Sequence, residues 1–365
     1  MSSQASQQRS TLMEEFTTVD LDVHLFGGFS GITIDDLAPH ISKPSENHLR
    51  NPSKFPFPTN GWNRSMGGKI KSVSFENADE LNEQLCVELG VDYPVLNAMS
   101  YLPKMPQEDL AIDLMRGFNN VVIEKYLDEY DHFRGLITVA TQQPDKVAEE
   151  IDRLADEDQI VGLYIATGGP MYPLGHPRYD VMYDAAQDND MAIVYHGHFG
   201  AFNQDFPRQN HAANNMFTVH PLAHAWCQML TVASLLGEGT PAKFPGLNFI
   251  FVEAGLGWVP YMMFRYNKEY GIRRSEVPLL EKTPEEYMRD QFYFATQPLG
   301  EPNDYEDLKK VVQALGAECI MFSTDYPHWD FDNPETINRF FRRTFSDDEL
   351  EMIFSGNAIE AIPRL

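Results

Sequence analysis

Cysteines are few in this sequence, and none of them forms a paired motif. Cys86, Cys227 and Cys319 are far apart, and no CxxC occurs in the 365 residues. Neither a disulfide framework nor a cysteine-ligated zinc site is therefore expected, and a reducing compartment is indicated. Residues 1–16 are rich in Ser and Gln and lack the apolar stretch of a secretory signal, and no apolar run approaches the length of a membrane span. We expect a cytoplasmic protein without a membrane partner, with residues 1–16 as a disordered tail.

Basic residues are also scarce. The chain has 28 Lys and Arg against 54 Asp and Glu, which gives a formal net charge of -26. Because phosphate binding needs a basic surface, nucleic acid is not expected as a partner. Phosphate-binding loops of the GxGxxG and GxxxxGK[ST] types are absent as well. Such acidity suits a protein that works in high salt, where ions screen the self-repulsion, and it equally suits an ordinary acidic cytosolic protein.

Apolar segments are numerous and regularly spaced. Hydrophobic residues make up 43% of the chain, enough to bury a large core. Strand-like segments alternate with helix-like ones, and the eight expected strands lie near residues 19, 95, 136, 162, 193, 250, 294 and 320. This number of βα units predicts an α/β fold, a (β/α)8 or TIM barrel formed by one domain, residues 17–365, with a doubly wound open sheet as the alternative. A Pro/Gly/Ser/Asn-rich segment, roughly residues 27–71, predicts a long excursion after the first strand.

Acidic residues and histidines stand where several of these strands end. The first strand ends Asp22-Val-His24, the fifth ends at His196 in a His-Gly-His sequence, the sixth ends at Glu253, and Asp325 follows the eighth. In a barrel all these tips point to one mouth, and residues i and i+2 of a strand share a face. Imidazole nitrogens and carboxylate oxygens are ligands for Zn²⁺ or Mn²⁺. The sequence therefore predicts a site for one divalent metal ion.

The same segments resemble those of a known family. They are Asp20-Leu21-Asp22-Val23-His24, Ala192-Ile193-Val194-Tyr195-His196, residues 251–260, residues 322–329 and Ser355-Gly356-Asn357-Ala358. From about residue 17 to its end, the chain resembles the amidohydrolase-related superfamily. Within it, the nearest branch contains aminocarboxymuconate-semialdehyde decarboxylase, resorcylate and carboxyvanillate decarboxylases, and uncharacterised metal-dependent hydrolases. The resemblance implies Asp22, His24, His196 and Asp325 as metal ligands, with Asp325 and His196 also catalytic, and a homodimer as the assembly.

Two positions depart from the patterns of this family. Many relatives have HxH on the first strand and some decarboxylases have Glu-x-His, whereas this chain has Asp22-x-His24. Many relatives also carry a catalytic His where this chain has Glu253, which either substitutes as an acid or base or orients Trp258 and Arg265. These departures keep open a third class of function, a binding or assembly protein that has lost turnover.

Two chemistries fit the predicted site. One is nonoxidative decarboxylation of a small aromatic or unsaturated carboxylic acid, with Asp325 delivering the proton that replaces carbon dioxide. The other is hydrolysis of a small amide, lactone or ester by a metal-activated water, with Asp325 as the general base. Arginine pairs well with carboxylates, so Arg64 and Arg265 are expected substrate contacts, together with Trp258 and His328 as pocket wall.

A second pair of histidines has helical spacing. His220 and His224 lie four residues apart and can share one helix face, but the glutamate of an HExxH motif is missing. We expect them in the core or in the wall of the pocket. Residues 200–216 follow the fifth strand and are expected to cover the substrate or to contact a second subunit.

Overall fold

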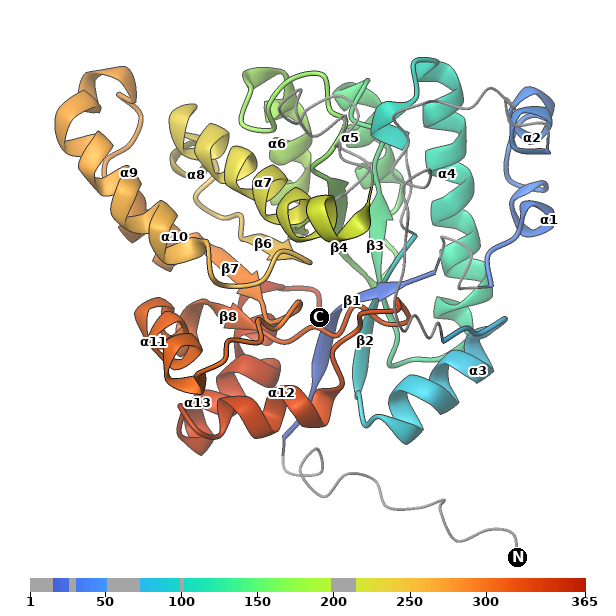
Figure 1. Ribbon diagram of the computed structural model, residues 1–365. Coiled ribbons are helices and arrows are strands. Elements are labelled where there is room, and N and C mark those ends of the chain that lie inside the picture. Colours follow the sequence, from blue (N-terminus) through green and yellow to red (C-terminus); the bar gives the residue numbers. More distant parts are fainter. Residues whose placement is uncertain (1–15, 26–30, 51–72, 99–101, 198–214) are drawn as a thin grey trace, which may run out of the picture.

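The predicted barrel is present. The computed structural model describes residues 16–25, 31–50, 73–98, 102–197 and 215–365, and these form one sheet of eight parallel strands in sequential order (Figure 1). The strands are β1 (Val19–His24), β2 (Tyr93–Asn97), β3 (Arg134–Thr138), β4 (Ile160–Ala166), β5 (Ala192–His196), β6 (Phe249–Val252), β7 (Phe292–Ala295) and β8 (Ile320–Met321). Each contains or adjoins one of the eight predicted positions, so the strand predictions are confirmed.

Contacts between β1 and the segment after β8 close the sheet. Val23 pairs in parallel with Tyr326, and the backbone N–H of His24 donates to the carbonyl of Tyr326 at 2.8 Å. The N–H of Leu21 donates to the carbonyl of Phe322 at 3.3 Å. This closure excludes the open sheet that the sequence left as an alternative.

Helices surround the barrel, as Figure 1 shows. They are α1 (Ile34–Leu37), α2 (Lys43–Arg50), α3 (Ala78–Leu81), α4 (Glu108–Lys125), α5 (Pro144–Arg153), α6 (Asp180–Asp188), α7 (Met216–Gly237), α8 (Thr240–Lys243), α9 (Val259–Arg273), α10 (Pro284–Gln291), α11 (Tyr305–Leu315), α12 (Pro334–Phe341), α13 (Asp347–Glu351) and α14 (Asn357–Ala361). Two π-helical segments, Asn82–Glu88 and Met352–Gly356, follow α3 and α13. No helix in these described ranges is long and apolar enough to cross a membrane.

Capping residues explain where several helices begin. Ser346 caps α13, because its hydroxyl accepts from the N–H of Glu349 in a capping box. The helix that carries His220 and His224, α7, begins at Met216, because the side chain of Asn215 accepts from the N–H of Thr218.

Two apolar clusters form the core. One lies between the sheet and the helices, and the other fills the barrel with side chains such as Val95, Leu136, Val194 and Val252. The inner cluster also includes Ala358 and Ile362, and the side chain of Arg364 donates to the carbonyls of Ile160 (2.7 Å) and Ala155 (2.9 Å). The C-terminal segment is thus fastened to the start of β4, at the end of the barrel opposite the strand tips.

The predicted tail and excursion are only partly described. Residues 1–15, 26–30 and 51–72 lie outside the described residues, whereas 31–50 form α1 and α2. The ammonium of Lys125 on α4 donates to Asp36 at 2.9 Å and so connects α1 to the barrel. Phe16, which the sequence assigned to the tail, stacks on Phe354 with ring centroids 5.9 Å apart.

Candidate metal centre

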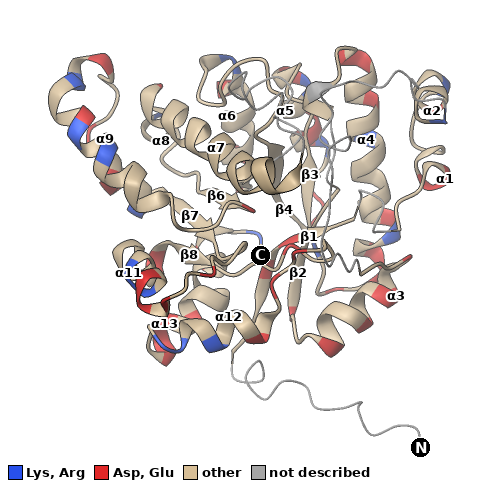
Figure 2. Cartoon of the chain, viewed as in Figure 1, with Lys and Arg blue, Asp and Glu red and all other residues tan. Residues whose placement is uncertain are grey.

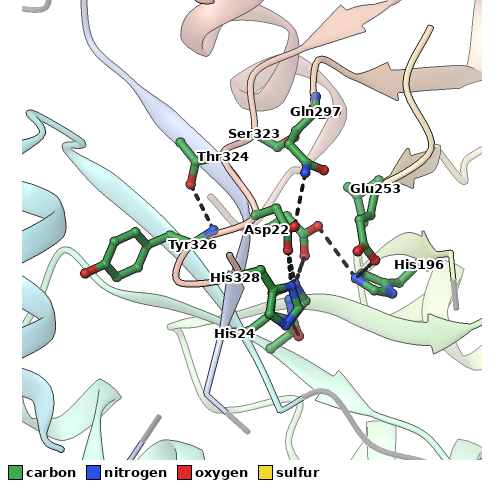
Figure 3. Close-up of polar contacts among 12 residues, drawn as sticks. Asp22, His24, His196, Glu253, Gln297, Ser323, Thr324, Tyr326 and His328 are labelled. Carbon is green, nitrogen blue, oxygen red and sulfur yellow. Dashed lines mark hydrogen bonds and ion pairs between the residues drawn. The ribbon is translucent and has the colours of Figure 1, made fainter. Parts of the chain in front are cut away.

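Side chains from β1, from β5 and from the segment after β8 converge at one end of the barrel (Figure 3). Nε2 of His24 on β1 lies 3.3 Å from Oδ1 of Asp22 and 2.8 Å from Oδ1 of Asp325. Nε2 of His196, the last residue of β5, lies 3.7 Å from Oδ2 of Asp22. All four side chains are at most 1% exposed. The structure therefore brings together the four residues predicted as ligands.

This cluster suits a divalent cation. Two groups of three residues have ligand atoms within 4.8 Å of one another, namely Asp22, His24 and His196, and His24, Asp325 and His328. Oδ2 of Asp22 is buried and accepts no hydrogen bond from the described residues. A buried carboxylate oxygen without such a partner is costly unless a cation lies beside it. The donor set of imidazole nitrogens and carboxylate oxygens fits Zn²⁺ or Mn²⁺.

Mutual repulsion among the carboxylates also favours a bound cation at this cluster. Burial raises the pKa of Asp22 well above its usual range, and the charges of Asp325 and Asp20 raise it further. Burial and the charges of Asp325 and Asp22 likewise raise the pKa of Glu253. A bound cation would relieve this repulsion, because opposite charges lower the pKa of a carboxyl group.

Asp325 is paired with an imidazole despite its burial. Burial alone would raise the pKa of Asp325, but His328 and His24 together hold it below its usual range. Burial would also lower the pKa of His328, and the neighbouring Asp325 reverses this and raises it. Nδ1 of His328 lies 2.5 Å from Oδ1 of Asp325, and the amide of Gln297 donates to Oδ2 at 3.0 Å. A carboxylate beside a protonated imidazole is the state that these contacts favour.

Unusual backbone conformations place two of the acidic side chains. Glu253, directly after β6, has a φ of 54°, and Asp325, four residues after β8, has a φ of 64°. Residues other than glycine seldom adopt this left-handed region, which costs about 1–3 kcal/mol at each position. Such strain is typical of residues that a binding or catalytic site holds in place.

Glu253 lies between two histidines. Its Oε2 is 2.8 Å from Nε2 of His196, and its Oε1 is 3.4 Å from Nε2 of His224 on α7. Burial lowers the pKa of His224 to about 3. One turn away on α7, Nε2 of His220 lies 3.7 Å from Oδ2 of Asp330. The two helix histidines therefore face the site, in agreement with the prediction that they line the core or the pocket.

Two other predicted substrate contacts, Arg265 and Trp258, have their described interactions with residues outside this cluster. Arg265 on α9 forms an ion pair with Glu269, and its side chain is 45% exposed. Trp258 packs edge to face on Phe294, with ring centroids 5.6 Å apart. Arg64, His198 and nearly all of residues 200–216 lie outside the described residues.

Two buried amides at the site carried no signal in the sequence. Asn97, the last residue of β2, contacts both Asp22 and His24, while Gln297 contacts Asp325. An amide at the end of a strand is common, so only the folded neighbours reveal these roles. The site is thus larger than the set of charged and imidazole side chains at the strand tips.

Proteins of known activity include relatives of this chain in sequence. The chain is 26% identical over 278 residues to gamma-resorcylate decarboxylase from Rhodococcus jostii strain RHA1, covering 71% of this chain and 77% of that relative. It is 25% identical over 273 residues to the enzyme of the same name from Rhizobium sp. strain MTP-10005, covering 70% and 76%.

Solved structures share the fold along nearly the whole chain. One is 5-carboxyvanillate decarboxylase from Sphingomonas paucimobilis, with a TM-score of 0.67, 19% identity, and coverage of 95% of this chain and 99% of that one. Another is dihydroxybenzoic acid decarboxylase from Polaromonas sp. JS666, which holds manganese and the inhibitor 2-nitroresorcinol; its TM-score is 0.67, with 19% identity and coverage of 95% and 96%. Residues 103–364 match the family model described as Amidohydrolase. The chain belongs to the amidohydrolase family.

Proposed function

We propose that this protein is a metal-dependent carboxy-lyase that removes carbon dioxide from a small aromatic carboxylic acid without an oxidant. The observation that carries the proposal is the buried pair of Asp325 and His328, whose Oδ1 and Nδ1 lie 2.5 Å apart beside the ligand cluster and can share a proton. Decarboxylation needs such a proton, because a hydrogen atom replaces the departing carboxylate. The relatives named above, which act on resorcylate, carboxyvanillate or dihydroxybenzoate, support the choice of an aromatic acid.

Asp22, His24, His196 and Asp325 would hold one divalent ion, Mn²⁺ or Zn²⁺. The manganese in the Polaromonas relative supports the first of these. When bound, the ion supplies positive charge for the substrate carboxylate and a neighbouring oxygen.

The protein's own groups would handle the proton. A proton that Asp325 receives from Nδ1 of His328 passes to the ring carbon that carries the carboxylate. As the bond between that carbon and the carboxylate breaks, its electron pair stays on the ring carbon and binds the proton, and carbon dioxide leaves. Gln297, which donates to Oδ2 of Asp325, keeps this carboxyl group oriented during the transfer.

His328 stays a proposed contact for the substrate, and its ring stacks on that of the ligand His24 with centroids 4.3 Å apart. Glu253 would hold His196 and His224 in place through its two oxygens. Arg64 stays a prediction for the substrate carboxylate. Arg265 is not retained for that role, because its guanidinium group is engaged by Glu269 on the same helix.

Metal analysis and product analysis test the proposal together. We expect about one Mn or Zn per chain in the wild type and in His48→Ala, which changes an exposed histidine of α2, and little metal in His196→Ala. Incubation of the wild type with hydroxybenzoic acids should release carbon dioxide, and His328→Ala should release it at least 100-fold more slowly. Turnover of amides, lactones or esters without carbon dioxide would replace the proposal with the hydrolase alternative. Absence of metal from the wild type, with the fold intact, would favour a binding protein.

We also propose a homodimer that associates through α7. This 22-residue helix contains no Asp, Glu, Lys or Arg, although the whole chain carries a formal net charge of -26 (Figure 2). Four of its apolar side chains are exposed: Phe217 (90%), Leu222 (51%), Trp226 (41%) and Leu230 (45%). Contact between two such uncharged faces would bury them and keep the acidic surfaces of the two copies apart.

A cytoplasmic location stays part of the proposal because of the low cysteine content.

A further inference from the structure

Asn97 connects the two ligand residues of β1. It is the last residue of β2, is fully buried, and is the register partner of His24 on the neighbouring strand. Its Nδ2 donates to Oδ1 of Asp22 at 2.9 Å, and its Oδ1 lies 2.9 Å from Nδ1 of His24. One amide group thus contacts both ligand side chains with its two ends.

The chemistry of the amide determines which way round it lies. As a metal ligand Asp22 is a carboxylate, which only accepts hydrogen bonds, so the nitrogen end of Asn97 must face it. Turning the amide over would put its oxygen against a carboxylate oxygen at 2.9 Å, which is repulsive. The oxygen end therefore faces His24, and Nδ1 of His24 must carry the hydrogen that it accepts.

This hydrogen bond leaves Nε2 of His24 with its lone pair. Nε2 points at two carboxylate oxygens, Oδ1 of Asp325 at 2.8 Å and Oδ1 of Asp22 at 3.3 Å. Without Asn97 the imidazole would place its hydrogen on Nε2 and donate it to Asp325, which would block the nitrogen as a ligand. Nε2 of His24 and Oδ1 of Asp325 then face each other as electron-pair donors without a hydrogen between them, which suits a cation.

The contact with Asp22 has a second consequence. Because Oδ1 of Asp22 is engaged by Asn97, the carboxylate is oriented with Oδ2 towards His196, 3.7 Å from its Nε2. The short aspartate side chain has few rotamers, and one hydrogen bond to Oδ1 selects among them. The same amide therefore aims the oxygen of one ligand and sets the tautomer of the other.

We propose that Asn97 is a positioning residue that presets the metal centre, by fixing His24 as the Nδ1–H tautomer and by turning Oδ2 of Asp22 towards the ion. The inference rests on the metal centre of the proposed function and does not depend on the reaction. Loss of Asn97 weakens metal binding even where the fold and the four ligands are intact. Outer contacts of this kind contribute about 10- to 100-fold in metal affinity.

The test compares two substitutions in the same layer of the barrel. Asn97→Leu keeps the approximate volume and removes both contacts. Thr138→Val is the matched control, because Thr138 ends the adjacent strand β3, is fully buried and donates its hydroxyl to the carbonyl of Ala98 without contacting a ligand residue. The dissociation constants of Mn²⁺ and Zn²⁺ are measured on metal-stripped protein by competition with a chelator. We expect a 10- to 100-fold weaker affinity for Asn97→Leu and a change of less than about threefold for Thr138→Val. Equal affinities of Asn97→Leu and wild type would overturn the proposal.

A second measurement needs no stable variant at position 97. Nitrogen-15 NMR of metal-free wild type at about pH 8, with the His24 signals assigned by their loss in His24→Gln, reports which ring nitrogen carries the hydrogen. A hydrogen on Nδ1 supports the proposal, and a hydrogen on Nε2 refutes it. Wild type that binds no metal would instead refute the metal centre itself, so the two failures are distinguishable.

Discussion

Asp330 offers a sharp test of the electrostatics around the site. Burial and the charge of Asp325 raise its pKa from 3.8 to about 7, although His328 acts in the opposite direction. Its side chain is 22% exposed, and Oδ2 lies 3.7 Å from Nε2 of His220. We predict that Asp330→Asn, which removes the charge and keeps the shape, stabilises the metal-free protein at alkaline pH.

The sign and size of this stability difference follow from the protons that the folded and unfolded states bind. The folded state holds the proton of Asp330 more tightly than the unfolded chain does, because the folded pKa is the higher one. Below pH 3.8 both states are protonated, so the carboxyl group has no effect on stability. From pH 3.8 to 7 the wild type progressively loses stability, and above pH 7 the full loss persists. A rise from 3.8 to about 7, at about 1.4 kcal/mol for each pH unit, amounts to roughly 4 kcal/mol, an upper limit for a group that keeps some contact with water.

Urea unfolding, followed by circular dichroism in the presence of a chelator, measures this difference. The free energy of unfolding of Asp330→Asn should exceed that of the wild type by about 2–4 kcal/mol at pH 8.5 and by less than about 1 kcal/mol at pH 4.5. The control Asp348→Asn changes an exposed residue of α13 and should have little effect at either pH. Saturating Mn²⁺ should reduce the difference in free energy of unfolding between variant and wild type at pH 8.5, because the ion offsets the charge of Asp325. A difference that is the same at both pH values would refute the reasoning.

Three other predictions concern the rest of the molecule. Arg364→Ala removes hydrogen bonds to the carbonyls of Ile160 and Ala155 and should lower the free energy of unfolding by roughly 2 kcal/mol, without changing the dissociation constant of Mn²⁺; unchanged urea unfolding would contradict this role. Trp226→Glu places a charge on the exposed face of α7 and should shift size-exclusion elution from dimer to monomer, whereas Lys310→Glu, 73% exposed on α11, should not. Raising KCl from 0.1 to 2 M should raise the unfolding midpoint, because screening relieves the repulsion within a chain of net charge -26; a flat response would make this an ordinary acidic protein.

The strands were predictable because their apolar residues report burial, which the barrel imposes on every strand. Even β8, only two residues long, was recognisable from Cys319-Ile-Met, since all three side chains are buried. Asp22 and His24 were predictable as partners because a spacing of two residues puts side chains on one face of a strand.

Other parts of the site were not predictable from the sequence, because their roles depend on which elements become neighbours in the fold. Asn97 and Gln297 are ordinary amides at strand ends until β1 and Asp325 lie beside them. Arg265 was assigned to the site because it follows β6 closely, but α9 also exposes Tyr261 and Phe264, so its sequence does not show which face points outward. Ion pairing with Glu269 determines its position instead.

The closure between β1 and the segment after β8 determines when the site can form during synthesis. Thr324 donates to Asp20 across a sequence separation of 304 residues, and the ligands Asp22 and Asp325 are similarly distant. At about 5–20 residues per second, a ribosome needs roughly 15–60 seconds between making the first ligand and the last. Until then the nascent chain has only Asp22, His24 and His196, so tight metal capture marks the arrival of the last strand. Metal binding by a stalled nascent chain would thus report whether the barrel has closed.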